Sequence, residues 1–212
     1  MRGVDACRDA KRGAGVAYLD RDGHLVERDV GGAELGVVVV AVGSQGVGSV
    51  PGALEMSVGA GDVVLAGCGD RELQADPPSE EDVGSAETFA RQTLTGAFAE
   101  VPVQKARTWV GVAGTVTTLS AIAQELPEYD AERTHLARLS LDQLRATTAA
   151  LLASTHDERA DNPAIHPGRV DVIAGGAVIV RVFAEELHAR AGIDELVVSE
   201  HDILDGIALG LA

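Results

Sequence analysis

The chain has 212 residues, enough for one domain or two small ones, and carries a formal net charge of −16. That charge excludes nucleic acid as an expected partner, because phosphate backbones are held by Lys and Arg side chains. No apolar run reaches the length of a transmembrane helix, so no membrane partner is expected either.

Hydrophobic residues make up 46% of the chain and aromatic residues only 3%, which predicts a core of aliphatic side chains packed between helices and buried strands. The two cysteines, Cys7 and Cys68, have no metal-ligand spacing. A disulfide framework is therefore not expected, and a reducing, cytoplasmic location is predicted.

The first third of the chain shows few regular elements. Residues 1–28 carry scattered charges without clear periodicity and are expected to be irregular, with Ala17–Leu19 as a short strand candidate. The valine-rich run at 35–42 predicts a buried strand, and 62–66 predict a second strand after a loop rich in Gly.

The remainder alternates between helical and extended patterns. A helix is predicted to start after a Ser79 cap, with acidic residues in its first turn, and to run to about Ala99. Its inner face is expected to hold Val83, Ala86, Phe89, Ala90, Leu94 and Ala97 or Phe98.

The later elements are expected in the following order: a strand at 107–112, a turn and helix to about 126, a short strand at 134–139, a helix capped by Ser140, a polar loop at 154–168, a helix at 169–191 ended by Gly192, a strand at 196–198 and a last helix at 202–211. This alternation predicts an α/β fold.

The segment Gly111–Leu119, Gly-Val-Ala-Gly-Thr-Val-Thr-Thr-Leu, follows a predicted strand and leads into a helix. This arrangement leaves backbone N–H groups free to hold an anion. Gly111 and Gly114 let the backbone approach a ligand, and Thr115 adds a hydroxyl donor. A tight strand-to-helix turn packed against a sheet explains the same pattern, and both interpretations stay open.

Two further motifs follow: Pro167–Ala177, which contains Pro-Gly-Arg-Val-Asp-Val-Ile, and Leu196–Ile207, which contains Val-Ser-Glu-His-Asp-Ile-Leu-Asp-Gly. Together with Gly111–Leu119, and at similar spacing, they resemble the Ppx/GppA family of exopolyphosphatases and guanosine pentaphosphate phosphohydrolases. The resemblance is good from about residue 74 onward. It implies an actin-like ATPase (ribonuclease H-like) domain, with a mixed sheet flanked by helices. It also implies magnesium-dependent attack of water on a terminal phosphoanhydride of polyphosphate or pppGpp.

The loop that family members carry as D-I-G-G-G-S-T-E has its nearest match in Asp29–Leu35, Asp-Val-Gly-Gly-Ala-Glu-Leu. The match is shorter and lacks the serine and the threonine, so an ordinary turn between two strands is an equal alternative. The resemblance implies the following site: Asp29 beside magnesium, Glu34 as the catalytic carboxylate, and Gly31, Gly32, Gly111, Gly114 and Thr115 as phosphate-binding residues.

The resemblance also implies that residues 29–212 correspond to the second of the family's two domains. Residues 36–72 fit poorly, as a frame shift or a diverged gene copy would explain, and 1–28 contain nothing like the first domain's phosphate loop or water-activating carboxylate. The chain alone is therefore expected to be weakly active or inactive. The alternative is a non-catalytic module for phosphate binding or dimerisation, with a homodimer as its assembly.

Other residues have simpler explanations. Glu200 and His201 match the family motif, but capping of the last helix is favoured for their turn. Arg169 and Asp171 are expected to interact with the end of their own helix. The Gly175–Gly176 pair indicates close helix packing. The histidines His135, His156 and His166 are expected to be isolated at the surface.

Overall fold

The structure, a computed structural model, describes the backbone of five strands at 15–19, 25–29, 37–42, 54–58 and 61–65. It describes residues 73–100 and 103–201 with their side chains, apart from those of Glu100 and Lys105.

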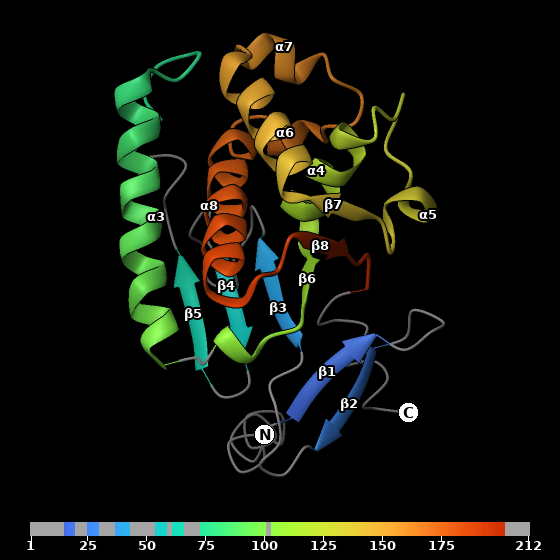
Figure 1. The fold of residues 1–212 in the computed structure, drawn as a ribbon. Coiled ribbons are helices and arrows are strands. Elements are labelled where there is room, and N and C mark those ends of the chain that lie inside the picture. Colours follow the sequence, from blue (N-terminus) through green and yellow to red (C-terminus); the bar gives the residue numbers. More distant parts are fainter. Residues whose placement is uncertain are drawn as a thin grey trace, which may run out of the picture.

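A six-stranded mixed sheet lies at the centre of the fold (Figure 1). Its strands stand in the order β5-β4-β3-β6-β8-β7. β3, β6 and β8 are parallel neighbours, whereas β4, β5 and β7 pair antiparallel. Their bounds are β3 Val37–Val42, β4 Leu54–Val58, β5 Gly61–Leu65, β6 Thr108–Val112, β7 Arg138–Ser140 and β8 Glu195–Val198. The predicted mixed α/β sheet is confirmed.

A separate two-stranded antiparallel sheet is formed by β1, Gly15–Leu19, and β2, Leu25–Asp29. The irregular conformation expected for residues 1–28 is wrong for these strands, although Ala17–Leu19 was placed correctly within β1. Each strand is only five residues long. A run this short shows too little periodicity to be recognised, and its stability comes from pairing with its neighbour.

The first long helix, α3, spans Glu80–Glu100 and begins as predicted. Ser79 Oγ accepts a hydrogen bond from Asp82 N at 3.1 Å, and the same serine lowers the pKa of the Asp82 carboxyl by hydrogen bonding to it. Ala90 and Leu94 of the expected inner face are buried, but the prediction for Phe89 is wrong, since Phe89 is 39% exposed. α3 lies at the outer edge beside α8 (Figure 1), so only a narrow stripe of it is covered.

The remaining helices follow α3 in the chain. They are η2 Val103–Lys105, α4 Ala113–Ala123, α5 Ala131–Thr134, α6 Leu141–Ala153, α7 His156–Ala160, η3 Pro167–Arg169 and α8 Ile173–Ala191. Ser140 caps α6 as predicted, and Gln143 completes a capping box that was not predicted. Gly192 ends α8 at φ 69°, as predicted.

Three of the predicted boundaries are wrong. The expected loop at 154–168 contains α7 and part of η3, α8 begins at Ile173 rather than at Arg169, and the strand expected from Thr134 begins at Arg138. In each case a short helix or a cap replaces a stretch whose local pattern is polar or ambiguous. The last predicted helix, at 202–211, lies outside the described residues.

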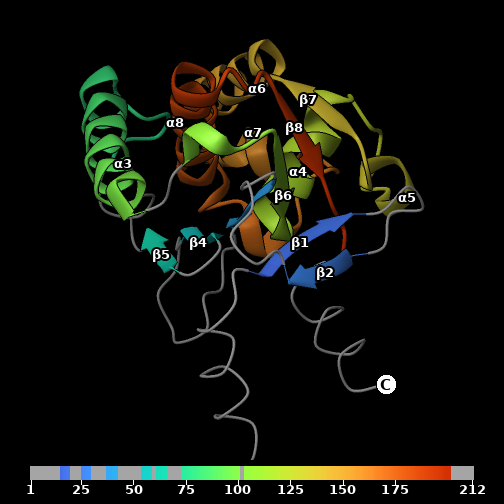
Figure 2. The ribbon, with the colours of Figure 1, turned by 60° about the horizontal axis from the view of Figure 1, so that its bottom comes forward.

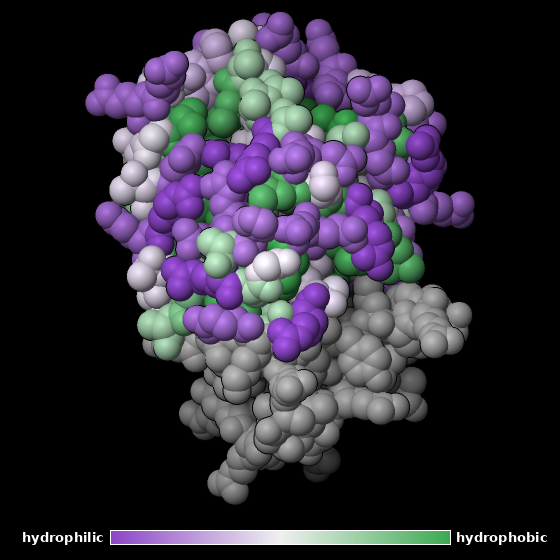
Figure 3. All heavy atoms as spheres, in the orientation of Figure 1, coloured by the Kyte–Doolittle hydropathy of each residue, from purple (hydrophilic) through white to green (hydrophobic). Residues whose placement is uncertain are grey.

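The main hydrophobic core joins β6 and β8 to buried side chains of α3, α4, α6 and α8. α3 and α8 run side by side in both ribbon views (Figures 1 and 2). The ring of Trp109 on β6 packs against Phe183 of α8 at 5.3 Å between centroids, and Phe183 packs against Phe98 of α3 at 5.7 Å. The face shown in Figure 3 is largely hydrophilic over the helices. None of the helices that the structure describes is long and apolar enough to cross a bilayer.

Candidate phosphate-binding site

The carboxyl ends of the parallel strands β6 and β8 meet at one edge of the sheet. Gly111 of β6 pairs with Val198 of β8, and Ser199 N donates to Gly111 O at 2.8 Å. The residues that follow the two strands therefore lie close together. Open α/β sheets bind ligands at this edge.

β6 passes directly into α4, so the separate turn expected between the strand and the helix is wrong. Val112 has extended backbone angles, Ala113 has φ 69°, and the helix starts there. Gly111 therefore belongs to β6, whereas Gly114 and Thr115 lie in the first turn of α4. Val112 provides no side-chain cap, and the first N–H groups of a helix have no acceptor within it. The junction thus offers backbone donors of the kind that bind anions.

Gly111 and Thr115 are packing positions. A Cβ on Gly111 would lie 2.7 Å from Leu196 Cδ1 and 2.8 Å from Val116 Cγ1, too close for a side chain. Thr115 is buried, and its Cγ2 lies 2.7 Å from where a Cβ of Gly176 would stand. These contacts favour the packed-turn interpretation for both residues, and they support the expected close approach of the α8 glycines to a neighbour.

Gly114 lies against the guanidinium of Arg169. A Cβ on Gly114 would stand 2.5 Å from Cζ and from Nε of Arg169, so glycine leaves the room that the guanidinium occupies. Arg169 Nη1 donates to Thr118 Oγ1 at 3.2 Å. Among the described residues, no carboxylate forms an ion pair with Arg169. The expected contact with its own helix is thus replaced by contact with α4.

The place of Arg169 is electrostatically unusual. The amino end of a helix carries positive partial charge, so a cation there is disfavoured. An anion between the guanidinium and the α4 N–H groups would be attracted by both and would remove their mutual repulsion. It would also accept from the fork of donors that Arg offers to phosphate. Arg169 lies within the motif Pro167–Ala177, so the sequence already singled out this region. Only the fold shows that its guanidinium contacts α4.

A second polar cluster lies beyond β8 and centres on Glu200. Its Oε1 accepts from Tyr129 OH at 2.6 Å and from the hydroxyl of Thr134. Glu200 N donates to His135 Nδ1 at 3.2 Å, and the His135 ring meets His201 edge to face at 4.8 Å. The isolated surface position expected for His135 is therefore wrong. The contacts of Tyr129 and Thr134 with Glu200 were not predicted either, because they join segments far apart in the sequence.

Burial dominates the ionisation behaviour of this cluster. It raises the pKa of Tyr129, and the hydrogen bond to Glu200 raises it further. Burial also lowers the pKa of His135, with His201 acting in the same direction and Glu200 opposing. The turn itself is closed by Ser199, whose Oγ accepts from His201 N at 3.1 Å. The helix that this turn was expected to cap lies beyond the described residues.

The other half of the predicted site cannot be placed against α4. Gly31, Gly32 and Glu34 lie outside the described residues, and Asp29 is described only as the last backbone position of β2. β2 and β3, the strands on either side of this loop, belong to different sheets. Within 73–100 and 103–201, no group of three His, Cys, Asp or Glu side chains could hold a metal ion.

Comparison with known proteins gives a consistent result. The sequence profile described as the Ppx/GppA phosphatase family matches residues 8–210, a range that includes 36–72. Exopolyphosphatase 2 of Mycobacterium tuberculosis (strain CDC 1551 / Oshkosh) is 45% identical over 208 residues, which cover 94% of this chain and 62% of that protein. The chain therefore spans less than two thirds of the length of this curated relative.

Solved structures agree on the fold. A crystal structure of an exopolyphosphatase-like protein is 30% identical, with a TM-score of 0.78, and the match covers 100% of this chain and 67% of that chain. The structure of the Aquifex aeolicus PPX-GPPA enzyme is 24% identical, with a TM-score of 0.65. The match covers 84% of this chain and 57% of that chain, and it shows the fold alone. The actin-like ATPase-type domain expected from the sequence is confirmed.

Proposed function

Because the chain belongs to the Ppx/GppA phosphatase family, we propose that it binds a phosphate chain at the junction of β6 and α4 and forms part of a phosphohydrolase. The observation that carries this proposal is the guanidinium of Arg169 lying on Gly114 at the amino end of α4. A phosphate oxygen there would accept from Arg169 and from the free N–H groups of the first turn.

The reaction that fits this site is attack of water on a terminal phosphoanhydride, with release of inorganic phosphate. Such a reaction needs donors for the phosphate oxygens, a cation to offset their charge and a carboxylate that orients water. Arg169 and α4 supply the donors. Magnesium, when bound, would offset charge on the substrate. We propose Asp29 as its ligand and Glu34 as the carboxylate, with the N–H groups of Gly31 and Gly32 facing phosphate.

Polyphosphate is the favoured substrate, since the relative that is 45% identical is named an exopolyphosphatase. The donors proposed for this anion site, Arg169 and the first N–H groups of α4, suit any phosphate chain, so pppGpp is the second candidate. The chain spans 62% of that relative, and phosphate held only by Arg169 and α4 would be open to water on one side. We therefore propose that the chain alone binds phosphate with weak turnover or none. A phosphate-binding or dimerisation module in a cytoplasmic homodimer is the alternative.

Binding is tested by calorimetric titration with inorganic tripolyphosphate. Arg169→Gln is expected to weaken the affinity about tenfold, because a charge-assisted, bidentate contact is lost. Arg107→Gln is the matched control, since Arg107 is exposed and precedes β6. It removes the same charge and should leave the affinity unchanged. Equal affinities of the wild type and Arg169→Gln would remove Arg169 from the site and the proposal with it.

Turnover is tested separately by phosphate release from polyphosphate and from pppGpp with magnesium. Asp29→Ala and Glu34→Ala are assayed beside the wild type. Weak release or none is expected from the chain alone. Strong release that either substitution abolishes would show that this chain carries the catalytic machinery and would overturn this expectation.

A further inference from the structure

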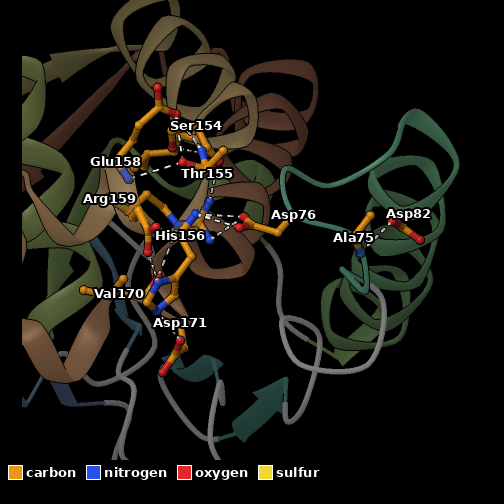
Figure 4. A network of polar contacts seen from close by, with 12 residues as sticks. Ala75, Asp76, Asp82, Ser154, Thr155, His156, Glu158, Arg159, Val170 and Asp171 are labelled. Atoms are coloured by element: carbon orange, nitrogen blue, oxygen red, sulfur yellow. Dashed lines mark hydrogen bonds and ion pairs between the residues drawn. The ribbon is translucent and has the colours of Figure 1, made fainter.

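A network of polar contacts joins α7 to the residues that follow Arg169 (Figure 4). It connects three segments that are far apart in the sequence: the stretch before α3, the end of α6 with α7, and the stretch between η3 and α8. We call it the Arg159 network, and its members are Asp76, Ser154, His156, Arg159, Val170 and Asp171.

Arg159 is the buried centre of this network, with a side chain only 8% exposed. Its Nη1 donates to Ser154 O at 2.6 Å, its Nε donates to Val170 O at 3.3 Å, and its Nη2 lies 3.4 Å from Asp76 Oδ1. A guanidinium is a rigid planar fork. It cannot shift toward one acceptor without losing another, and a buried donor left unpaired is costly. The three segments are therefore held at fixed distances.

His156 adds a second connection from α7. Its backbone N donates to both carboxylate oxygens of Asp76, at 2.8 and 3.0 Å. Its ring Nε2 lies 3.1 Å from Asp171 Oδ1. The two residues directly after Arg169 are thus both held by α7, Val170 through its carbonyl and Asp171 through its carboxylate.

Arg169 needs such support because its own element is short. η3 has three residues, and its backbone bonds there are Arg169 N to His166 O at 2.8 Å and Val172 N to Arg169 O at 3.1 Å. A 3-10 turn of this length holds its residues weakly. The direction in which Arg169 leaves the backbone is therefore fixed mainly by what holds its neighbours.

The geometry points to Arg159 as a positioning residue that, with His156, holds Val170 and Asp171 so that the guanidinium of Arg169 lies on Gly114. The polar partners of Arg159 among the described residues are Ser154, Val170 and Asp76, so it acts on Gly114 and Thr118 only through Arg169. The consequence for phosphate rests on the proposed function, whereas the placement of Arg169 does not.

Two variants of the full chain test this inference. Arg159→Lys keeps a charge near Asp76 but cannot reach three acceptors with one rigid fork. Asp171→Ala removes a side chain that is 81% exposed, so folding is retained even if Arg159→Lys does not fold. Arg181→Lys is the matched control, because Arg181 is 16% exposed and pairs with Glu87 and Glu185. Among the described residues, it makes no polar contact with the Arg159 network.

The first measurement is the NMR resonance of Arg169 Nε–Hε without ligand, assigned by its loss in Arg169→Lys. It is expected to shift in Arg159→Lys and in Asp171→Ala and to stay in place in Arg181→Lys. The second measurement is calorimetric titration with inorganic tripolyphosphate. Arg159→Lys is expected to bind about tenfold more weakly than the wild type.

The outcomes separate the two proposals. An unmoved Arg169 resonance in both folded variants overturns the positioning role. A moved resonance with weakened tripolyphosphate binding supports both proposals. A moved resonance in a chain whose wild type does not bind tripolyphosphate supports the positioning role and removes the proposed function.

Discussion

At the scale of single residues, the contact between Thr115 and Gly176 sets how closely α4 approaches α8. A Cβ at position 176 would lie 2.7 Å from Thr115 Cγ2. Gly176→Ala is therefore expected to destabilise the chain by about 1–3 kcal/mol through overpacking. Urea unfolding measures this cost. Thr115→Ser removes the obstructing methyl, so Gly176→Ala should cost less in that background, and an equal cost in both backgrounds would show that this contact is not the cause.

His135 is predicted to make stability depend on pH. Burial and His201 hold its pKa below the ordinary value, so in the window just below about 6.5 the unfolded chain binds more protons than the folded one. Stability contributed by neutral His135 is thus present above that value and is lost as the pH falls.

Urea unfolding between pH 7.5 and 5 checks this sign. The wild type is expected to lose more unfolding free energy than His135→Gln, which cannot titrate but keeps an acceptor for Glu200 N. Titrating groups that do not interact with His135 are common to both proteins and cancel in the comparison, whereas the coupling to His201 and Glu200 is part of the measured difference. Identical pH profiles would exclude His135 as the source.

At the scale of elements, α3 carries two glycines that nothing in the structure requires. Gly84 and Gly96 are exposed, and a Cβ at either position would meet no atom within 4 Å. Gly84→Ala and Gly96→Ala are each expected to stabilise the chain by about 1 kcal/mol, because alanine loses less backbone entropy in a helix. Thermal and urea unfolding measure the gain. A loss of stability in either variant would indicate a contact of α3 that the structure does not describe.

The elements predicted correctly are those with strong local signals. The valine-rich run gives β3, the Ser79 cap gives the start of α3, and Gly192 gives the end of α8. α7 was missed although Thr155 and Glu158 have the spacing of a capping box, because five residues are too short for a helical periodicity to show. The contacts of Arg159 with distant segments also hold α7, and no local pattern contains them.

The candidate site shows the same limit. Gly114 could be singled out from its place between a strand and a helix, and the motif around Arg169 was visible in the sequence. The contact between Gly114 and the Arg169 guanidinium could not be predicted, because it depends on where η3 is held relative to α4. The prediction for Phe89 is wrong for the opposite reason: its spacing is right, but α3 lies at the edge of the fold, and within the described part of the chain nothing buries that side.

At the scale of the whole molecule, the net charge of −16 opposes any polyanion, whereas the site depends on a local cation and backbone dipoles. The two effects differ in range. Raising the ionic strength from 0.01 to 0.15 M shortens the Debye length from about 30 to about 8 Å, which screens the distant acidic residues before the partly buried contact of Arg169.

The affinity for inorganic tripolyphosphate is therefore expected to rise over this salt range, about two- to threefold, where a surface rich in Lys and Arg would show a steep fall. Calorimetric titrations at constant pH in 0.01 and 0.15 M NaCl measure the change. Arg169→Gln should bind weakly at both concentrations, because screening the acidic surface does not replace the lost donors. A tenfold fall in wild-type affinity would mean that tripolyphosphate binds to a basic surface elsewhere on the chain and not at the amino end of α4.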